Sequence, residues 1–184
     1  MDIIKKYDVI YADPPWTFKT FSNKGKNRSP EKHYDVMSLQ DICNLPVNKI
    51  SKDNSVLLMW VTDPLLDKAF KVIEAWGFKY KTVGFTWAKT NRKSKGFFTG
   101  LGYWTRGNPE MCLLATKGKP KRISKSVPQL VIEQRREHSR KPDIIYNHIE
   151  NLLEGSYIEL FARTQRSGWD SWKSNRQVLK KGGN

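Results

Sequence analysis

Short apolar runs that alternate with amphipathic segments limit the folds open to this chain more than any other feature of its sequence. Each run is too short for a helix and is typical of a strand buried on both faces. The runs predict strands at Tyr7–Ala12, Ser55–Val61, Val83–Ala88, Met111–Thr116, Leu130–Glu133 and Tyr157–Ala162.

Helices are predicted between these strands. Ser38 can cap a short helix that Pro46 ends, and Pro64 opens a second helix that Gly77 ends. The segment Pro142–Leu153 has apolar residues at helical spacing and forms a third. This alternation predicts an α/β fold, a mostly parallel sheet with helices on both faces. In such folds, ligands bind beyond the carboxyl ends of the strands.

The first apolar run stops at Asp13-Pro14-Pro15-Trp16, which allows two interpretations. In one, the four residues are only a rigid turn, in which Asp13 caps and Trp16 fills a gap. In the other, they are a site that presents a carboxylate, a carbonyl and an aromatic ring at the end of a strand. Neither proline has an N–H group, and the fixed φ of proline makes the loop rigid. The four residues alone favour the turn.

Composition indicates a polyanionic partner. The chain has 184 residues, which predicts one domain over residues 1–184, and a net charge of +15 with seven tryptophans. A charge of this size attracts polyanions, and aromatic side chains in a basic chain offer stacking surfaces for bases. The alternative is a basic protein whose charge only keeps it in solution.

Cysteine, histidine and apolar patterns exclude other classes. Cys43 and Cys112 show no metal or redox spacing, and the three histidines suggest no metal site. No apolar run is long enough to span a membrane, and the N-terminus lacks the apolar region of a signal peptide. A reduced intracellular protein is therefore the default expectation.

A basic and aromatic insertion, residues 90–109, lies between two predicted strands. Cations next to aromatic rings suit phosphate contact and base stacking. The alternative is a solvated loop whose aromatic side chains fold under it. The residues concerned are Arg92, Lys93, Lys95, Phe97, Phe98, Tyr103, Trp104 and Arg106.

Asp13-Pro14-Pro15-Trp16 has the groups needed to hold the exocyclic amine of adenine. This amine is a poor nucleophile because its lone pair is delocalised into the ring. Two acceptors, the Asp13 carboxylate and the Pro14 carbonyl, could bind its two N–H groups and direct the lone pair. Trp16 could stack on a base that has left its helix. Positioning next to an electrophilic methyl group would then account for most of the catalysis.

The chain resembles the adenine-N6 methyltransferases of the family named after the seventy-kilodalton subunit of the mRNA methyltransferase. After "DPPW", the family's order and approximate spacing continue through "HYDVMSLQDI", "FTWAKTN", "GNPEMCLLATKG", "REHSRKPDIIYNHIE" and "IELFARTQRSGWDSW". The resemblance implies a Rossmann-like methyltransferase sheet with an antiparallel edge. It also implies a permuted order, catalytic motif before cofactor motif, and S-adenosylmethionine as cofactor.

The resemblance also implies residue roles. Asp13, Pro14, Pro15 and Trp16 match the catalytic loop. Substrate contacts are expected from Trp16 and from a group of residues in the following segments: Tyr34, Lys89, Arg106, Asn108 and Arg136. Cofactor contacts are expected from Asp13, Lys141, Glu159, Arg163, Gln165, Arg166, Trp169 and Asn175.

Some of these assignments have alternatives. Glu159 and Arg163 could form an ordinary surface ion pair, and Lys141 could simply precede a helix-opening proline. We expect Lys141 to bind the α-carboxylate of the cofactor, and Gln165 or Asn175 to bind its ribose. Where relatives have Gly-Asn-Glu, this chain has Lys-Ser-Asn-Arg at residues 173–176, so the contact within this segment stays open.

The sequence therefore predicts an S-adenosylmethionine-dependent enzyme that methylates N6 of adenine in DNA that is single-stranded or has a flipped base. DNA is favoured because the chain is short and looks like the compact bacterial or phage members. This likeness also implies a location in the cytoplasm of a bacterial cell or of a phage-infected host. RNA is the alternative substrate. A catalytically silent nucleic-acid-binding subunit is a rival, but such subunits tend to lose the acid and tryptophan of the catalytic loop. Dimerisation could compensate for the small size of the chain.

Overall fold

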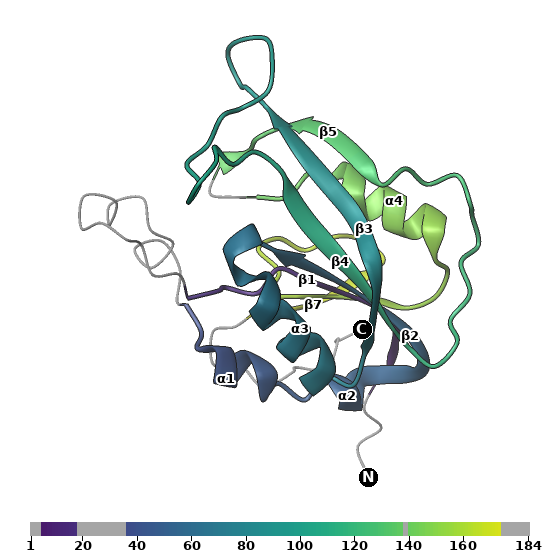
Figure 1. The fold of residues 1–184 in the computed structure, drawn as a ribbon. Coiled ribbons are helices and arrows are strands. Elements are labelled where there is room, and N and C mark those ends of the chain that lie inside the picture. The colour runs from purple at the N-terminus through teal and green to yellow at the C-terminus, as the bar shows by residue number, and fades with distance from the viewer. Residues whose placement is uncertain (1–4, 18–35, 138–139, 174–184) are drawn as a thin grey trace.

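The predicted strands come together in one mixed sheet (Figure 1). The structure is a computed structural model that describes residues 5–17, 36–137 and 140–173. In chain order, the elements are β1 (Tyr7–Ala12), α1 (Leu39–Cys43), α2 (Val47–Ile50), β2 (Ser51–Val61), the 3-10 helix η3 (Asp63–Leu65), α3 (Leu66–Ala75), β3 (Lys79–Thr90), β4 (Glu110–Lys117), β5 (Leu130–Gln134), α4 (Ile144–Leu152), β6 (Tyr157–Leu160) and β7 (Trp169–Trp172).

The sheet is mostly parallel, as predicted. Its strand order is β5-β3-β4-β2-β1-β6-β7. The pairs β1/β2, β1/β6, β6/β7 and β3/β5 are parallel, whereas β4 is antiparallel to both β2 and β3. Of the described strands, β4 alone therefore runs against the others.

The antiparallel strand is not at the edge of the sheet, which corrects the expected position. β4 lies between β3 and β2, and β5 forms the edge beyond β3. β3 and β4 pair as the two arms of a long hairpin, and β5 then returns outside β3. An apolar pattern shows that a segment is a strand but does not show which strands will flank it.

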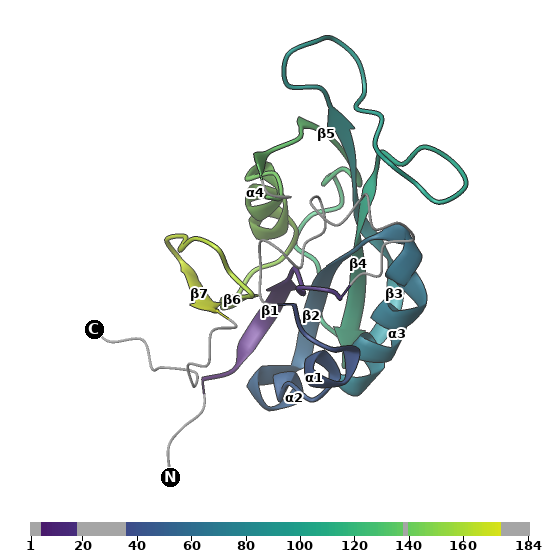
Figure 2. The same cartoon turned by 90° about the vertical axis from the view of Figure 1, so that its left-hand side faces the viewer.

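Helices cover both faces of the sheet, as predicted (Figure 2). Because successive side chains of a strand point to opposite faces, Ile10 and Tyr11 belong to different cores. The core under α1 and α3 contains Ile10, Leu57, Ala69, Ile73 and Trp76. The core under α4 contains Tyr11, Trp60, Trp87, Ile145 and Ile149.

Local signals identified several helix ends. The Ser38 hydroxyl accepts a hydrogen bond from the Asp41 N–H at 3.1 Å and caps α1. Gly77 follows α3 with φ +81°, a conformation that glycine adopts without strain. The predicted cap and the predicted end are both present.

The prediction that Tyr157–Ala162 is the last strand is wrong. β6 ends at Leu160, and β7 continues the sheet by pairing Tyr157 with Trp169 and Leu160 with Trp172. The sequence of β7, Trp-Asp-Ser-Trp, has neither a continuous apolar run nor enough length to show a period. It becomes a strand because the exposed edge of β6 offers its backbone hydrogen bonds.

The strand directions bring distant segments to one edge of the sheet. β1 and β6 end where β4 begins, so the residues after Ala12, the start of β4 at Glu110 and the residues after Leu160 share this edge. From β1 the chain first builds the sheet on the β2 side, and after α4 it returns to the other side of β1 as β6. The strand order therefore reverses between β1 and β6, the place where open α/β sheets bind ligands. Within the described residues, no helix has the length and apolarity to cross a membrane.

Candidate active site

The loop Asp13-Pro14-Pro15-Trp16 is held at several points. The Trp16 N–H donates to the Pro14 carbonyl at 2.9 Å, and the Met37 N–H donates to the Pro15 carbonyl at 3.0 Å. The indole Nε1 of Trp16 donates to the carbonyl of Trp60 at 3.2 Å. The predicted rigid turn is therefore present, but the Pro14 carbonyl already accepts one hydrogen bond and is not free.

The Asp13 carboxylate lies against the ammonium group of Lys141. Lys141 Nζ donates to Asp13 Oδ1 at 3.0 Å and to Oδ2 at 2.9 Å. A guanidinium nitrogen of Arg163 is 4.0 Å from Oδ2. The Lys141 side chain is 11% exposed and the Asp13 side chain 21%, so water screens this contact weakly. Residues that follow β1, precede α4 and follow β6 thus meet at one carboxylate.

Glu110 completes this charge network and is the functional candidate that sequence reasoning missed. Its carboxylate is 2.5 Å from Lys89 Nζ and 3.1 Å from Lys141 Nζ, and its side chain is 12% exposed. Burial would raise the Glu110 pKa, but the charges of Lys141 and Lys89 outweigh burial and lower it. Burial would lower the Lys141 pKa, but Asp13 and Glu110 raise it above its ordinary value. At neutral pH, an alternating row of charges runs from Lys89 through Glu110 and Lys141 to Asp13.

The only sequence signal for Glu110 is an acid at the very start of an apolar strand. A carboxylate in that position is rarely buried without a partner. Its partners come from β3 and from the segment before α4, and no local pattern links these three segments.

A hollow lies beside this network, at the point between β1 and β6 where the strand order reverses. Its lining includes Tyr11, Asp13, Lys141, Tyr146, Glu159, Phe161 and Arg163. The Tyr146 hydroxyl donates to Glu159 Oε2 at 2.8 Å. Burial first, and then the charge of Asp13, raise the pKa of Glu159 to about 7, although the Tyr146 hydrogen bond opposes them. Such a shift beside a concave site is typical of functional carboxyl groups.

Phe161 has an unusual backbone conformation at this hollow. It is the only non-glycine residue with positive φ in the described part of the chain, at 63°. Left-handed backbone is costly for a bulky residue and is concentrated at functional sites. The turn follows β6 directly and returns the chain toward Asp13, which Arg163 approaches.

Arg136 lies between β5 and α4 and contacts the residue that precedes α4. Its guanidinium is 2.5 Å from the carboxylate of Asp143, which Arg140 also contacts at 3.1 Å. Burial would raise the Asp143 pKa, but the two guanidinium groups lower it. Arg136 therefore holds the segment that carries Lys141, instead of projecting freely toward a substrate.

Asn108 braces the insertion. Its Oδ1 accepts from the Lys89 N–H at 2.9 Å, and its Nδ2 donates to the Lys89 carbonyl at 2.9 Å and to the Phe98 carbonyl. The amide is thus used inside the protein. Arg106 is exposed two residues earlier.

Arg166 and Trp169 are not brought to Asp13. Arg166 Nε and Trp169 Nε1 donate to Glu150 of α4 at 3.1 and 2.7 Å, and Trp169 stacks on Tyr157 with 4.7 Å between ring centroids. Trp169 begins β7 and pairs with Tyr157, the first residue of β6, so it lies at the amino ends of these strands, away from Asp13. Gln165 is exposed in the turn between them and β6. Two other predicted residues, Tyr34 and Asn175, lie outside the described residues.

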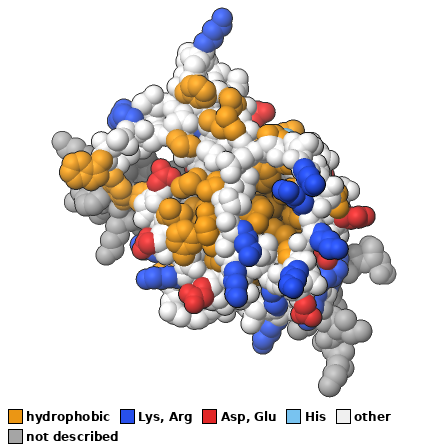
Figure 3. All heavy atoms as spheres, turned by 45° about the vertical axis from the view of Figure 1, so that its right-hand side comes forward, with side chains coloured by type: hydrophobic (Ala, Val, Ile, Leu, Met, Phe, Trp, Pro, Cys, Tyr) orange, Lys and Arg blue, Asp and Glu red, His pale blue; other side chains and the backbone are white. Residues whose placement is uncertain are grey.

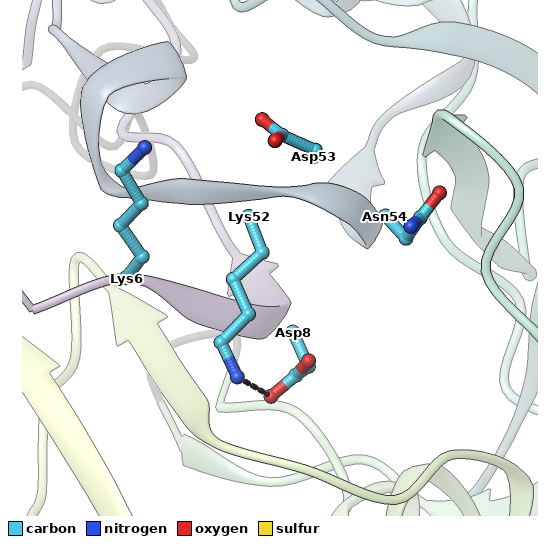
Figure 4. A pocket seen from close by; sticks show the side chains of 5 residues that line it. All are labelled: Lys6, Asp8, Lys52, Asp53 and Asn54. Atoms are coloured by element: carbon cyan, nitrogen blue, oxygen red, sulfur yellow. Dashed lines mark hydrogen bonds and ion pairs between the residues drawn. The ribbon is translucent and has the colours of Figure 1, made fainter.

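A second hollow lies at the amino ends of β1 and β2 and is lined by Lys6, Asp8, Lys52, Asp53 and Asn54 (Figure 4). Lys52 Nζ donates to Asp8 at 2.7 Å, so the pair neutralises itself there. This hollow is shallow, has no aromatic lining and lies at the edge away from Asp13. No group of His, Cys, Asp or Glu in the described part of the chain could hold a metal ion.

Comparison with known proteins gives the family of the chain. The model of the MT-A70 family matches residues 7–175. The chain is 35% identical over 187 residues to the type II methyltransferase M.MunI of a Mycoplasma species, covering 91% of this chain and 77% of that protein. It is 31% identical to an N(6)-adenosine-methyltransferase MT-A70-like protein of Arabidopsis thaliana and 29% identical to the human N(6)-adenosine-methyltransferase catalytic subunit METTL3. These matches cover 92% and 89% of this chain but only 24% and 27% of the two relatives.

The α/β sheet and these similarities place the chain in a methyltransferase family. The chain belongs to the MT-A70 family, as the sequence motifs predicted.

Proposed function

We propose that the protein transfers a methyl group from S-adenosylmethionine to N6 of adenine in DNA. The observation that carries this proposal is the position of Asp13: a rigid loop holds its carboxylate at the strand-order reversal, against Lys141 and next to a hollow. The similarity to a type II methyltransferase supports DNA, and the N(6)-adenosine-methyltransferases among the relatives support the adenine amine. The permuted motif order and a single domain over residues 1–184 stay predictions.

The residues of the hollow fit S-adenosylmethionine. Lys141 and Arg163 are cations suited to its α-carboxylate, and Asp13 is an acceptor for its ammonium group. Glu159 is an acceptor suited to the ribose hydroxyls, with Tyr146 fixing one of its oxygens. The bound cofactor supplies an electrophilic methyl group.

The loop orients the amine of the target adenine. The Asp13 carboxylate keeps lone pairs beyond those directed at Lys141, and the Pro14 carbonyl keeps a second lone pair beside the one used by Trp16. These two acceptors bind the two N–H groups of the amine and direct its lone pair toward the methyl group. Because Lys141 balances the charge of Asp13, this carboxylate would orient the amine as a neutral group without deprotonating it first, and the proton released on methylation would pass to solvent. Trp16 supplies a stacking surface for the adenine.

The surface suits a nucleic acid. On the face drawn in Figure 3, Lys and Arg side chains gather beside an apolar area. The chain carries a net charge of +15, and Arg106 lies exposed in the insertion. The predicted contact by Tyr34 fits this proposal but lies outside the described residues. Lys89 is tied to Glu110 and acts by holding the site together.

The test is methyl transfer from labelled cofactor to adenine-containing DNA and RNA oligonucleotides, followed by digestion to nucleosides and mass spectrometry. We expect N6-methyladenine in DNA, and a loss of at least about a hundredfold in Asp13→Ala and in the isosteric Asp13→Asn. Asp170→Ala is the matched control, because it removes an ion-paired carboxylate outside the site. Undiminished transfer by Asp13→Ala would contradict the proposed role of the loop.

The same assay separates the alternatives. Methylated RNA with unmethylated DNA would make RNA the substrate, and methylated cytosine would replace adenine as the target. Tight binding of nucleic acid without transfer would identify a silent subunit, although the intact Asp13 and Trp16 favour an enzyme. A homodimer and a cytoplasmic location stay predictions; light scattering would test the first.

A further inference from the structure

The insertion between β3 and β4 exposes an unusual amount of apolar surface. Trp104 is 100% exposed, Leu101 73% and Phe97 61%. Exposed large apolar side chains that cluster are typical of a binding surface. In Figure 1 the insertion extends beyond the sheet, on the side where β1 ends.

The base of this insertion is firmly held. The Phe98 N–H donates to the Lys89 carbonyl at 2.8 Å, and the Gly100 N–H donates to the Gly107 carbonyl at 2.7 Å. The Arg135 guanidinium lies 4.2 Å from the centroid of the Phe98 ring, and Asn108 bonds both backbone groups of Lys89. The tip at residues 101–106 is therefore a braced turn.

A glycine makes the turn tight. A Cβ atom on Gly102 would lie 1.8 Å from the carbonyl oxygen of Thr105, so no other residue fits without moving the backbone. Trp104 stands within this turn. Its full exposure thus belongs to a defined local structure.

The braced turn is connected to the candidate active site through Lys89. The Lys89 backbone holds Asn108, and its ammonium group holds Glu110, the residue that begins β4 and also contacts Lys141. Both ends of the insertion therefore start within the charge network around Asp13. The tip is therefore carried by a segment whose two ends are fixed beside the candidate active site.

We propose that Leu101 and Trp104 form a wedge that enters the base stack of a DNA duplex and occupies the space left by the target adenine. This inference rests on the proposed function. A paired adenine cannot reach the loop at Asp13 unless it leaves the stack. Apolar side chains inserted between base steps unstack and kink a duplex. A wedge on the segment that begins and ends at the site would open the duplex where the amine is needed.

The charges of the insertion favour nucleic acid over a protein partner. Arg92, Lys93, Lys95 and Arg106 accompany the exposed apolar residues, and the insertion has no acidic residue between residues 90 and 109. This pattern suits phosphates on either side of a stacked base. Lysine, which occurs twice in the insertion, is instead depleted at protein–protein interfaces.

The experiment compares Trp104→Ala and Trp104→Phe on three substrates: a DNA duplex, the same duplex with abasic sites opposite its adenines, and the single strand. Ile123→Ala is the matched control, because it removes an exposed apolar side chain outside the insertion. We expect Trp104→Ala to lower methylation of the duplex about tenfold more than that of the other two substrates, the order expected from one stacking contact. Trp104→Phe should retain most of the activity on the duplex.

A second readout does not depend on methyl transfer. The duplex carries 2-aminopurine in place of the adenines of one strand, and the fluorescence emission of this base analogue rises when it leaves the stack. The native chain should raise it on binding, and Trp104→Ala should not. Equal losses by Trp104→Ala on all three substrates, or no rise with the native chain, would overturn the wedge.

The outcomes separate the wedge from the proposed function. Native methylation of the single strand but not of the duplex would overturn the wedge and leave the proposed function intact. A rise in emission without any methyl transfer would support the wedge and contradict the proposed function. A change of oligomeric state in Trp104→Ala with unchanged emission would make the tip a protein contact and overturn the wedge.

Discussion

Replacing Glu110 by Gln is the sharpest test of the charge network. The substitution keeps the shape of the side chain but removes the negative charge shared by two ammonium groups. Lys89 and Lys141 approach this carboxylate at 2.5 and 3.1 Å, and the three side chains are 11–17% exposed. Two positive charges would then remain close together, and the carboxylate of Asp13 contacts the ammonium group of Lys141.

The expected cost follows from this burial. Removing one partner of a buried ion pair costs about 3–5 kcal/mol, because the other charge stays buried without compensation. At about 3 kcal/mol, the melting temperature of a chain of this length should fall by about 6–12 °C. Methyl transfer, measured well below the new melting temperature, should fall at least about tenfold, since Lys141 no longer has a fixed position against Asp13.

A second substitution distinguishes lost charge balance from general damage. Lys89→Met removes one of the two ammonium groups, so Glu110→Gln/Lys89→Met should be more stable than the sum of the single changes, by about 1–3 kcal/mol. The lowered pKa of Glu110 also sets a pH window. Its stabilisation is present above the ordinary value of 4.5 and is lost as the pH falls through the lower pKa of the folded state. The difference in the free energy of unfolding between the native chain and Glu110→Gln should therefore become smaller only at acidic pH.

Urea unfolding of the native chain, the two single variants and the double variant measures their free energies of unfolding. Glu154→Gln is the control, because Glu154 is exposed. The shared role of this carboxylate would be refuted if Glu110→Gln lowered the free energy of unfolding by less than about 1 kcal/mol. It would also be refuted if the changes in free energy of the two single variants simply added up in the double variant.

Three further predictions concern pH, salt and the insertion. Because burial and the Asp13 charge raise the pKa of Glu159 from 4.5 to about 7, the folded protein binds a proton that the unfolded chain releases between these values. Stability should fall as the pH rises through this window, and urea unfolding of Glu159→Gln should lack that slope. Raising the salt concentration should weaken DNA binding, measured by fluorescence anisotropy, far more than cofactor binding, measured by calorimetry; equal weakening would argue against the basic surface. Gly102→Ala should lower methylation of a duplex at least about fivefold while shifting the melting temperature little, because its Cβ would displace the tip at Thr105; unchanged activity on the duplex would argue against a defined tip.

Local patterns were enough for most of the elements. Continuous apolar runs are long enough to identify β1 and β2, and the Ser38 cap and Gly77 identify helix ends because these signals act within a few residues. The position of β4 and the existence of β7 required the sheet itself. Strand pairing depends on which backbone edges are left open once the other strands are in place.

The site divides in the same way. Asp13-Pro14-Pro15-Trp16 can be recognised in the sequence as a candidate site because its proposed role depends on the stiffness and chemistry of adjacent residues. Arg166 and Trp169 follow Arg163 by only a few residues in the sequence, yet their side chains contact Glu150. Proximity in sequence was a poor guide there, because the chain turns again between Arg163 and the start of β7 at Trp169.

By itself, the amino-acid sequence determined the family and the α/β class and marked out the candidate catalytic loop, since these depend on periodicity and on residues that touch their neighbours in the chain. Only the tertiary structure decided that Glu110 joins Lys89 to Lys141, and that Lys141 neutralises Asp13. Charges interact through space over a few ångströms in a region with little water. Which charges come within that distance depends on how the strands are ordered.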